Sequence, residues 1–134
     1  MQPQTINEVS NRIAMDVTNG KDIWGSMPYH VNDFRHWLLS LISEAGKDAD
    51  SVVSMAVKDA PVKTGTPVTD VYLAGLAEYL SQNHNLVVPS WANDPQNFLK
   101  EPYYTGSKRL QDLLTATTPS AWRRRLLFCG ESSF

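Results

Sequence analysis

The sequence is short of cysteine, of net charge and of long apolar runs, and each shortage excludes a class of protein. Cys129 is the only cysteine in 134 residues, so no disulfide within the chain can stabilise it and stability must come from packing. The formal net charge is −2, whereas a nucleic-acid-binding chain normally has clustered Lys and Arg and a basic isoelectric point. The longest apolar run, around 37–42, is far too short to cross a bilayer, and residues 1–12 show no signal-peptide pattern. We therefore expect a cytoplasmic protein that is not embedded in a membrane.

The composition is that of one folded domain. The chain is 42% hydrophobic and 19% charged, with four Trp, five Tyr and four Phe, which is enough apolar surface to build a packed core. A length of 134 residues leaves little room for a second core. We predict a single domain over residues 1–134, with a candidate internal hinge in the proline- and glycine-containing stretch at 60–67.

Apolar residues recur at helical spacing in the N-terminal half of the chain. Thr5 followed by Glu8 is the pattern of a capping box, and an apolar stripe then runs as far as Gly20, which is expected to end the helix. The segment with Trp24, Gly25 and Pro28 is expected to form a loop. Residues 32–45 carry the strongest stripe, which consists of Phe34, Trp37, Leu38, Leu41, Ile42 and Ala45, and Trp37 and Leu41 are expected to be buried.

Further helices are predicted over 48–59, 67–82, 108–115 and from 120 onward, with a short helical turn after Asp94-Pro95. Gly75 falls in the middle of one of them and costs about 1 kcal/mol relative to Ala, which a close helix–helix contact would justify. The predicted fold is all-α: a compact bundle of six to seven helices with an irregular, proline- and aromatic-rich C-terminal segment.

No set of residues in the sequence has the spacing that catalysis or metal binding requires. The three histidines, His30, His36 and His84, lack the spacing of a zinc site. Asp70 and Glu78 lie about two turns apart on one predicted helix, and we interpret them as solvated acids. There is no glycine-rich phosphate loop. The sequence therefore predicts no catalytic residue, no metal and no cofactor, and a protein that is not an enzyme.

The run Arg123-Arg124-Arg125 has two interpretations. One or two of the guanidinium groups can cap carbonyls at the end of their helix and pair with acids. Alternatively, the run can anchor an acidic partner surface or phosphate.

The aromatic residues in the C-terminal third also have two interpretations, as core residues or as part of a binding surface. Core packing is the default, but several of them lie in irregular, proline-flanked segments where full burial is harder, so they can form a surface for a partner. The candidate partner-binding residues are Trp91, Phe98, Tyr103, Tyr104, Trp122, Arg123, Arg124 and Arg125.

Residues 73–128 resemble a segment of small bacterial antitoxin-like proteins that are encoded beside nucleotidyltransferase-type toxins. The resemblance is carried by these pieces: LAGLAEYL (73–80), VPSW (88–91), DP (94–95), FL (98–99), PYY (102–104), TPSAWRRR (118–125) and LLF (126–128). It implies a bacterial protein of a toxin–antitoxin or phage-defence pair that neutralises a cognate toxin encoded nearby.

The leading hypothesis from the sequence is a non-enzymatic protein-binding module of the antitoxin kind, which blocks a partner toxin or defence protein by direct contact. The alternatives are a nucleic-acid-binding regulator that uses Arg123 to Arg125, and a structural or adaptor protein of a phage or mobile element.

Overall fold

A computed structural model describes residues 4–134 of the chain. Within that range the chain is 66% helix and 3% strand. Five helices are longer than four residues: α1 (Ile6–Thr18), α2 (Ile23–Ala45), α3 (Ala49–Val57), α4 (Pro67–Asn83) and α5 (Gln111–Thr117). A single turn, α6 (Ser120–Arg123), and short 3₁₀ turns complete the helical structure. The all-α class is confirmed, and the expected count of six to seven helices is wrong.

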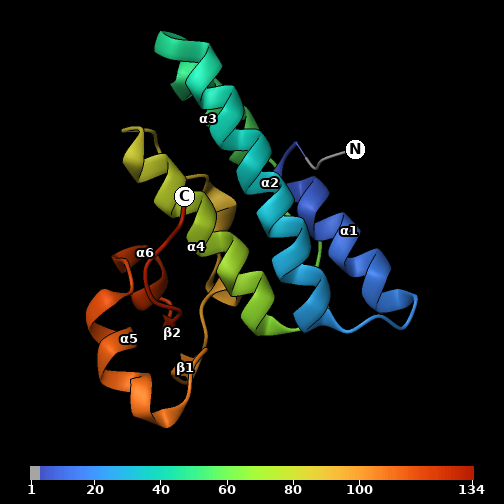
Figure 1. Cartoon of the computed structure of the whole chain (residues 1–134), viewed down its shortest axis with the longest axis vertical. Coiled ribbons are helices and arrows are strands. Elements are labelled where there is room, and N and C mark those ends of the chain that lie inside the picture. The colour runs from blue at the N-terminus through green and yellow to red at the C-terminus, as the bar shows by residue number, and fades with distance from the viewer. Residues whose placement is uncertain (1–3) are drawn as a thin grey trace.

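Helix α4 lies at the centre of the molecule. Figure 1 shows it between α1, α2 and α3 on one side and the C-terminal elements α5 and α6 on the other. Six consecutive residues, 73–78, are buried, and such a run covers more than one full turn. Helix α4 is therefore enclosed on all sides, as an interior helix is.

Local signals set the ends of α1 and α4 as predicted. The Thr5 hydroxyl accepts a hydrogen bond from the backbone N–H of Glu8 at 3.0 Å, and Thr66 caps α4 by accepting from the N–H of Thr69. The Glu8 carboxylate accepts from the N–H of Gln4 rather than from that of Thr5. The capping box is therefore closed one residue earlier than its usual form.

Helix α2 begins at Ile23, so the prediction of a loop around Trp24, Gly25 and Pro28 is wrong. Proline lacks the N–H for one helical hydrogen bond, yet Pro28 lies inside the helix. Burial of Ile23 against the core and hydrogen bonds from Ser26 and His30 to α1 hold the first turns in place. These contacts join distant residues, so local propensity did not reveal them.

The buried face of α2 uses part of the predicted stripe. Phe34 and Leu38 are fully buried, and Val31 extends the same face. Trp37 is partly buried against the core, and Leu41 is only partly buried. Phe34 and Leu38 are therefore the deepest positions of the stripe, whereas Leu41 is less buried than the sequence indicated.

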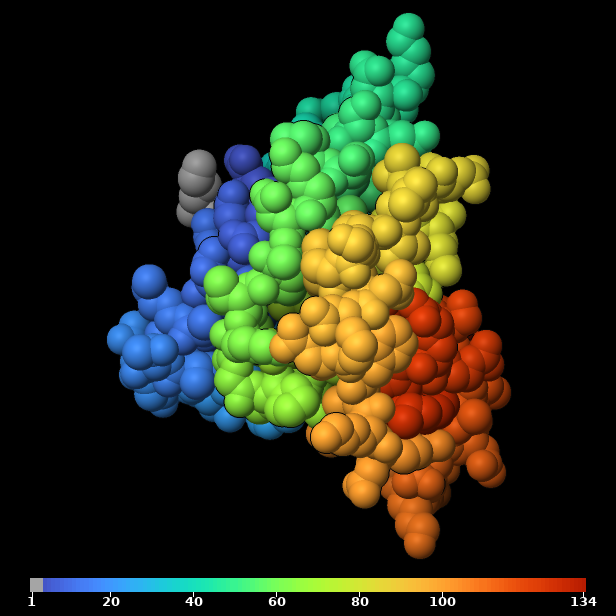
Figure 2. Space-filling model, turned by 180° about the vertical axis from the view of Figure 1, so that it is seen from behind, coloured from blue at the N-terminus to red at the C-terminus, as the bar shows by residue number. Residues whose placement is uncertain are grey.

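The C-terminal segment is irregular, as predicted, but it contains a small sheet that the sequence did not show. Strand β1 (Tyr103–Tyr104) pairs in parallel with β2 (Leu127–Phe128), with Tyr103 opposite Leu127. Two residues per strand are too few for a period-2 pattern to be recognised. Figure 2 shows residues 88–104, in yellow and orange, lying on the back of the molecule beside the red C-terminal residues.

The stretch at 60–67 is tied to helices before and after it. The Val62 N–H donates to Ser10 Oγ at 2.9 Å, and Asn7 donates to the Ala60 carbonyl at 2.8 Å. Thr64 is buried against Asp70 of α4. A hinge at this place stays a prediction.

Replacing Leu38 with Ala is expected to lower the free energy of unfolding by about 2–5 kcal/mol, because the substitution leaves a cavity beside a fully buried position. Leu39→Ala is the matched control: Leu39 is exposed, and we expect a change within about 0.5 kcal/mol. Urea titration of both variants measures the difference. Equal midpoints would show that the α2 face is assigned incorrectly.

Candidate functional site

The structure does not bring the predicted partner-binding residues to one surface. Tyr103 and Arg123 are exposed, whereas Trp122 and Arg125 are buried and offer no accessible side chain in this conformation. Of the remaining four, Trp91, Phe98 and Tyr104 are partly buried, and Arg124 is exposed but paired with Glu78.

Trp122 packs directly against the glycine in the middle of α4. A Cβ atom at Gly75 would lie 2.3 Å from the indole ring, so no larger residue fits. The indole N–H donates to the Tyr72 carbonyl at 3.0 Å, and the ring lies against Tyr72 and Tyr79 with centroid separations of 5.6 and 5.0 Å. The close contact expected at Gly75 is confirmed, with α6 as the partner.

Glu78 and two of the three arginines form a buried ionic network. Glu78 Oε1 accepts from Arg125 Nη1 at 2.8 Å and from Arg124 Nε at 2.8 Å. Arg125 also donates to the Ala121 carbonyl at 2.6 Å and the Ala92 carbonyl at 2.7 Å. Pairing and carbonyl capping, the first interpretation of the arginine run, therefore describes Arg124 and Arg125. The interpretation of Glu78 and Asp70 as solvated acids is wrong, because both are buried.

The same network fixes Phe98 and the charge of Glu78. The guanidinium carbons of Arg124 and Arg125 lie 5.0 and 4.8 Å from the centroid of the Phe98 ring, within cation–π range. Burial raises the pKa of Glu78, but the hydrogen bonds and charges of Arg124 and Arg125 outweigh it, so the net pKa lies below its ordinary value.

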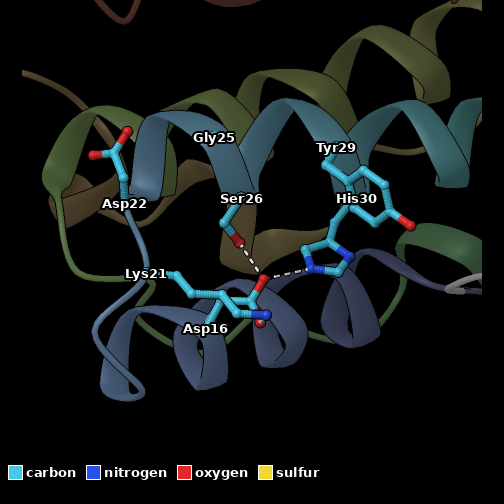
Figure 3. A pocket seen from close by; sticks show the side chains of 7 residues that line it. All are labelled: Asp16, Lys21, Asp22, Gly25, Ser26, Tyr29 and His30. Atoms are coloured by element: carbon cyan, nitrogen blue, oxygen red, sulfur yellow. Dashed lines mark hydrogen bonds and ion pairs between the residues drawn. The ribbon is translucent and has the colours of Figure 1, made fainter.

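A pocket of about 500 Å³ lies between α1 and α2. Figure 3 shows the side chains of Asp16 and Lys21 facing those of Ser26 and His30 across the gap between the two helices. Asp16 Oδ2 lies 2.8 Å from Ser26 Oγ and 2.8 Å from His30 Nε2, and Lys21 Nζ lies 3.5 Å from Oδ1. The carboxylate is therefore surrounded by donors from the facing helix and the connecting loop.

This pocket does not have the geometry of a serine–histidine–aspartate relay. Ser26 and His30 both contact the carboxylate, so the histidine is not placed to take a proton from the serine. The other ring nitrogen, His30 Nδ1, is enclosed without a hydrogen-bond partner. The arrangement instead fastens the start of α2 to the end of α1. The hydrogen bonds from His30 and then Ser26 hold the pKa of Asp16 below its ordinary value.

Sequence reasoning missed this cluster because it treated Ser26 as part of a loop. Ser26 and His30 have the i, i+4 spacing that puts two side chains on one helix face. That signal becomes visible only once α2 is known to begin at Ile23. Asp16 lies ten residues before Ser26, and nothing local in the sequence joins the two.

Residues 4–134 contain neither a cluster of metal ligands nor a membrane-spanning helix. No group of three or more His, Cys, Asp or Glu side chains is arranged to hold a metal ion. In the same range, no helix is long and apolar enough to span a bilayer.

Comparison with protein-family models, with curated proteins and with solved structures finds no match to the chain. The residues that carry the resemblance over 73–128 do have a clear place in the structure. Gly75, Glu78, Phe98, Trp122 and Arg125 all belong to the packed unit formed by α4 and the C-terminal segment. These five residues pack and pair within the chain.

Replacing Arg125 with Met is expected to lower the free energy of unfolding by about 3–5 kcal/mol, because it removes one partner of a buried ion pair. Arg123→Met, which removes an exposed charge of the same type, should change it by no more than about 0.5 kcal/mol. Denaturant unfolding of the two variants tests the assignment. Similar losses in both would contradict a special role for Arg125.

Stability should also fall in acid through Asp16. The folded-state pKa of this group is lowered, and its unfolded value is about 3.9. Its contribution is therefore complete above about pH 5 and is lost as pH falls through the folded-state pKa, because the unfolded chain binds the proton first. The gap in unfolding free energy between the parent and Asp16→Asn should shrink as pH drops below about 4. A gap that stays constant from pH 7 to pH 3 would contradict this role.

Proposed function

We propose that the protein is a protein-binding module whose contact surface is formed by Trp24, Tyr103, Leu110 and Leu113, called here the arm surface. The observation that carries the proposal is the exposure of these four large apolar side chains, which are 45%, 37%, 45% and 58% exposed. Trp24 and Tyr103 lie together, and exposed large apolar side chains are typical of protein interfaces.

Two aromatic rings make the most distinctive part of the arm surface. Trp24 and Tyr103 stack with their centroids 6.4 Å apart and their planes 4° from parallel. Trp and Tyr are enriched among residues that dominate binding energy. Because the rings brace each other, little side-chain entropy remains to be lost when a partner binds.

The arm, residues 103–114, is attached by one face only. On its inner face Tyr104 stacks on Phe128, and Leu114 lies against Gly106 and Gly130. Helix α5 itself buries no residue completely, and Figure 1 shows α5 and β1 at the opposite end of the molecule from α3. Leu110 also lies against Gly106 but is 45% exposed, and Leu113 is 58% exposed, so both leave apolar surface for a partner.

For the partner, the resemblance of residues 73–128 favours a cognate toxin or defence protein, so the proposed role is antitoxin-like neutralisation by direct contact. The nucleic-acid alternative loses its main support because Glu78 engages two of the three arginines. Only Arg123 in the run has a side chain that makes no hydrogen bond or ion pair within residues 4–134. A structural or adaptor role in a phage or mobile element would use the same arm surface.

The test is co-expression with the product of the neighbouring gene, followed by titration of the two purified proteins. The parent chain should rescue growth from a toxic neighbour. Leu113→Ser and Tyr103→Ser should each weaken binding about tenfold or more, as loss of an interface anchor does. Both variants should remain folded, because the side chains are exposed.

Met55→Ser is the matched control, since Met55 is also 58% exposed but lies on α3. Its affinity should equal that of the parent. Equal weakening by Met55→Ser and Leu113→Ser would contradict the assignment of the arm surface. Binding to a non-toxic neighbour would favour the adaptor role, and a DNA shift that falls steeply with salt would favour the nucleic-acid alternative.

A further inference from the structure

Ser81, in the last turn of α4, has a buried hydroxyl group without a hydrogen-bond partner. The residue has no exposed surface, and its Oγ bonds to no donor or acceptor within residues 4–134. A serine hydroxyl in a helix usually points to solvent or donates to the carbonyl of the preceding turn, and Ser81 does neither. A buried hydroxyl without a partner is costly, so this group marks a place where an atom from outside the chain can bind.

Ser81 lies at a hollow of about 220 Å³ between α3, the end of α4 and the segment that follows α4. It is the most deeply buried residue that lines this hollow, whereas Ser54, Lys58 and Ser90 line it at exposed positions. Figure 2 shows the end of α3, in green, beside the yellow residues at the end of α4 and after it. None of the residues of the arm surface lines the hollow, so a ligand here would be independent of the proposed function.

The polar side chains of the hollow are all able to donate hydrogen bonds. They are three hydroxyl groups and one ammonium group, from Ser54, Ser81, Ser90 and Lys58. None of the four is paired with a side chain or a backbone group of residues 4–134. In the same range, no acidic side chain lines the hollow. Hydroxyl and ammonium groups donate, so the hollow suits a ligand group that only accepts.

We propose that this hollow binds an alkyl carboxylate, with the carboxylate group held by Lys58 and the serine hydroxyls. An ionised carboxylate has two oxygens that only accept hydrogen bonds, and its single charge matches the single ammonium group of Lys58. A phosphate group carries about 1.5 to 2 negative charges at pH 7, more than one lysine neutralises. Lys58 follows the C-terminal end of α3, whose negative partial charge also opposes a dianion more than a monoanion.

Apolar side chains form the rest of the hollow and provide a surface for the alkyl chain of the ligand. They belong to Val57, Leu86, Val87, Pro89 and Trp91. The ring of Trp91 is held in place, because its indole N–H donates to the Val57 carbonyl at 3.0 Å. A fixed apolar wall beside unpaired donors favours a carboxylate with a short alkyl chain over an inorganic anion.

The experiment is an NMR titration of the ¹⁵N-labelled chain at constant pH and ionic strength, read at the indole N–H of Trp91 and the backbone amide of Ser81. The probe is butyrate, and the controls are butyramide, which keeps the shape but has no charge, and inorganic phosphate. Saturable shifts with butyrate are expected, with at least fivefold weaker binding of both controls. Equal binding of butyrate and either control would overturn the proposal. No shift with any probe would also overturn it.

The first variant, Ser81→Ala, removes the unpartnered hydroxyl. It should weaken butyrate binding at least threefold and leave the melting temperature of the free protein unchanged or higher, because no hydrogen bond within the chain is lost. A lower melting temperature would show that the hydroxyl has a partner in the chain, and unchanged affinity would show that the ligand does not use it. Either result would overturn the proposal.

The second variant, Lys58→Met, removes the only charged group that lines the hollow within the described residues, so it should weaken butyrate binding at least fivefold. Lys47→Met is its matched control, because Lys47 is also exposed but lies before α3 and does not line the hollow. The affinity of the control should equal that of the parent. Equal effects of the two lysine variants would overturn the proposal.

Discussion

The buried ion pair between Glu78 and Arg125 is the interaction on which the C-terminal half of the structure depends. Arg125 has no exposed surface, and its guanidinium group joins α4, the carbonyl of Ala92 and the carbonyl of Ala121. Removing such a charge from water costs several kcal/mol, which only a well-placed counter-charge and further hydrogen bonds offset. The pair therefore specifies where the 3₁₀ turn at 90–93 and the α6 turn lie on α4, and with them the position of Trp122.

Aromatic residues in irregular segments are buried here more than the sequence indicated. The expectation rested on the difficulty of burying irregular backbone. The structure shows how that difficulty is met: Trp91 donates its indole N–H to the Val57 carbonyl at 3.0 Å, and Phe98 lies against two guanidinium groups. A hydrogen bond from an aromatic side chain, or a guanidinium group beside it, thus allows a non-helical segment to pack against the core. Tyr103, by contrast, is exposed and stacks on Trp24 of α2.

The parts of the fold that could be predicted are those specified by neighbouring residues. The caps at Thr5 and Thr66 and the contact at Gly75 follow from local chemistry, and each lies where the sequence placed it. The start of α2 and the partners of Glu78 depend on residues 10 to 47 positions away, so no window of sequence contained them. For the same reason the sequence did not reveal the cluster around Asp16. It also did not show that Arg124 and Arg125 of the arginine run pair with Glu78. Of the four residues proposed for the arm surface, only Tyr103 was among the candidates from the sequence, because the stacking of Trp24 on Tyr103 joins residues 79 positions apart.

The packing of Trp122 against Gly75 also affects the order in which the chain folds and the way in which it locally unfolds. Residues 78 and 125 are 47 positions apart, and closing so long a loop costs entropy before any contact is gained. Helices α1 to α3, whose contacts are more local, are therefore expected to form first and the C-terminal segment to dock late. In the native state, the segment that docks last is expected to open first. The backbone amides of α5, which buries no residue, should therefore exchange with deuterium through local opening. Those of α4 should exchange only when the whole domain unfolds.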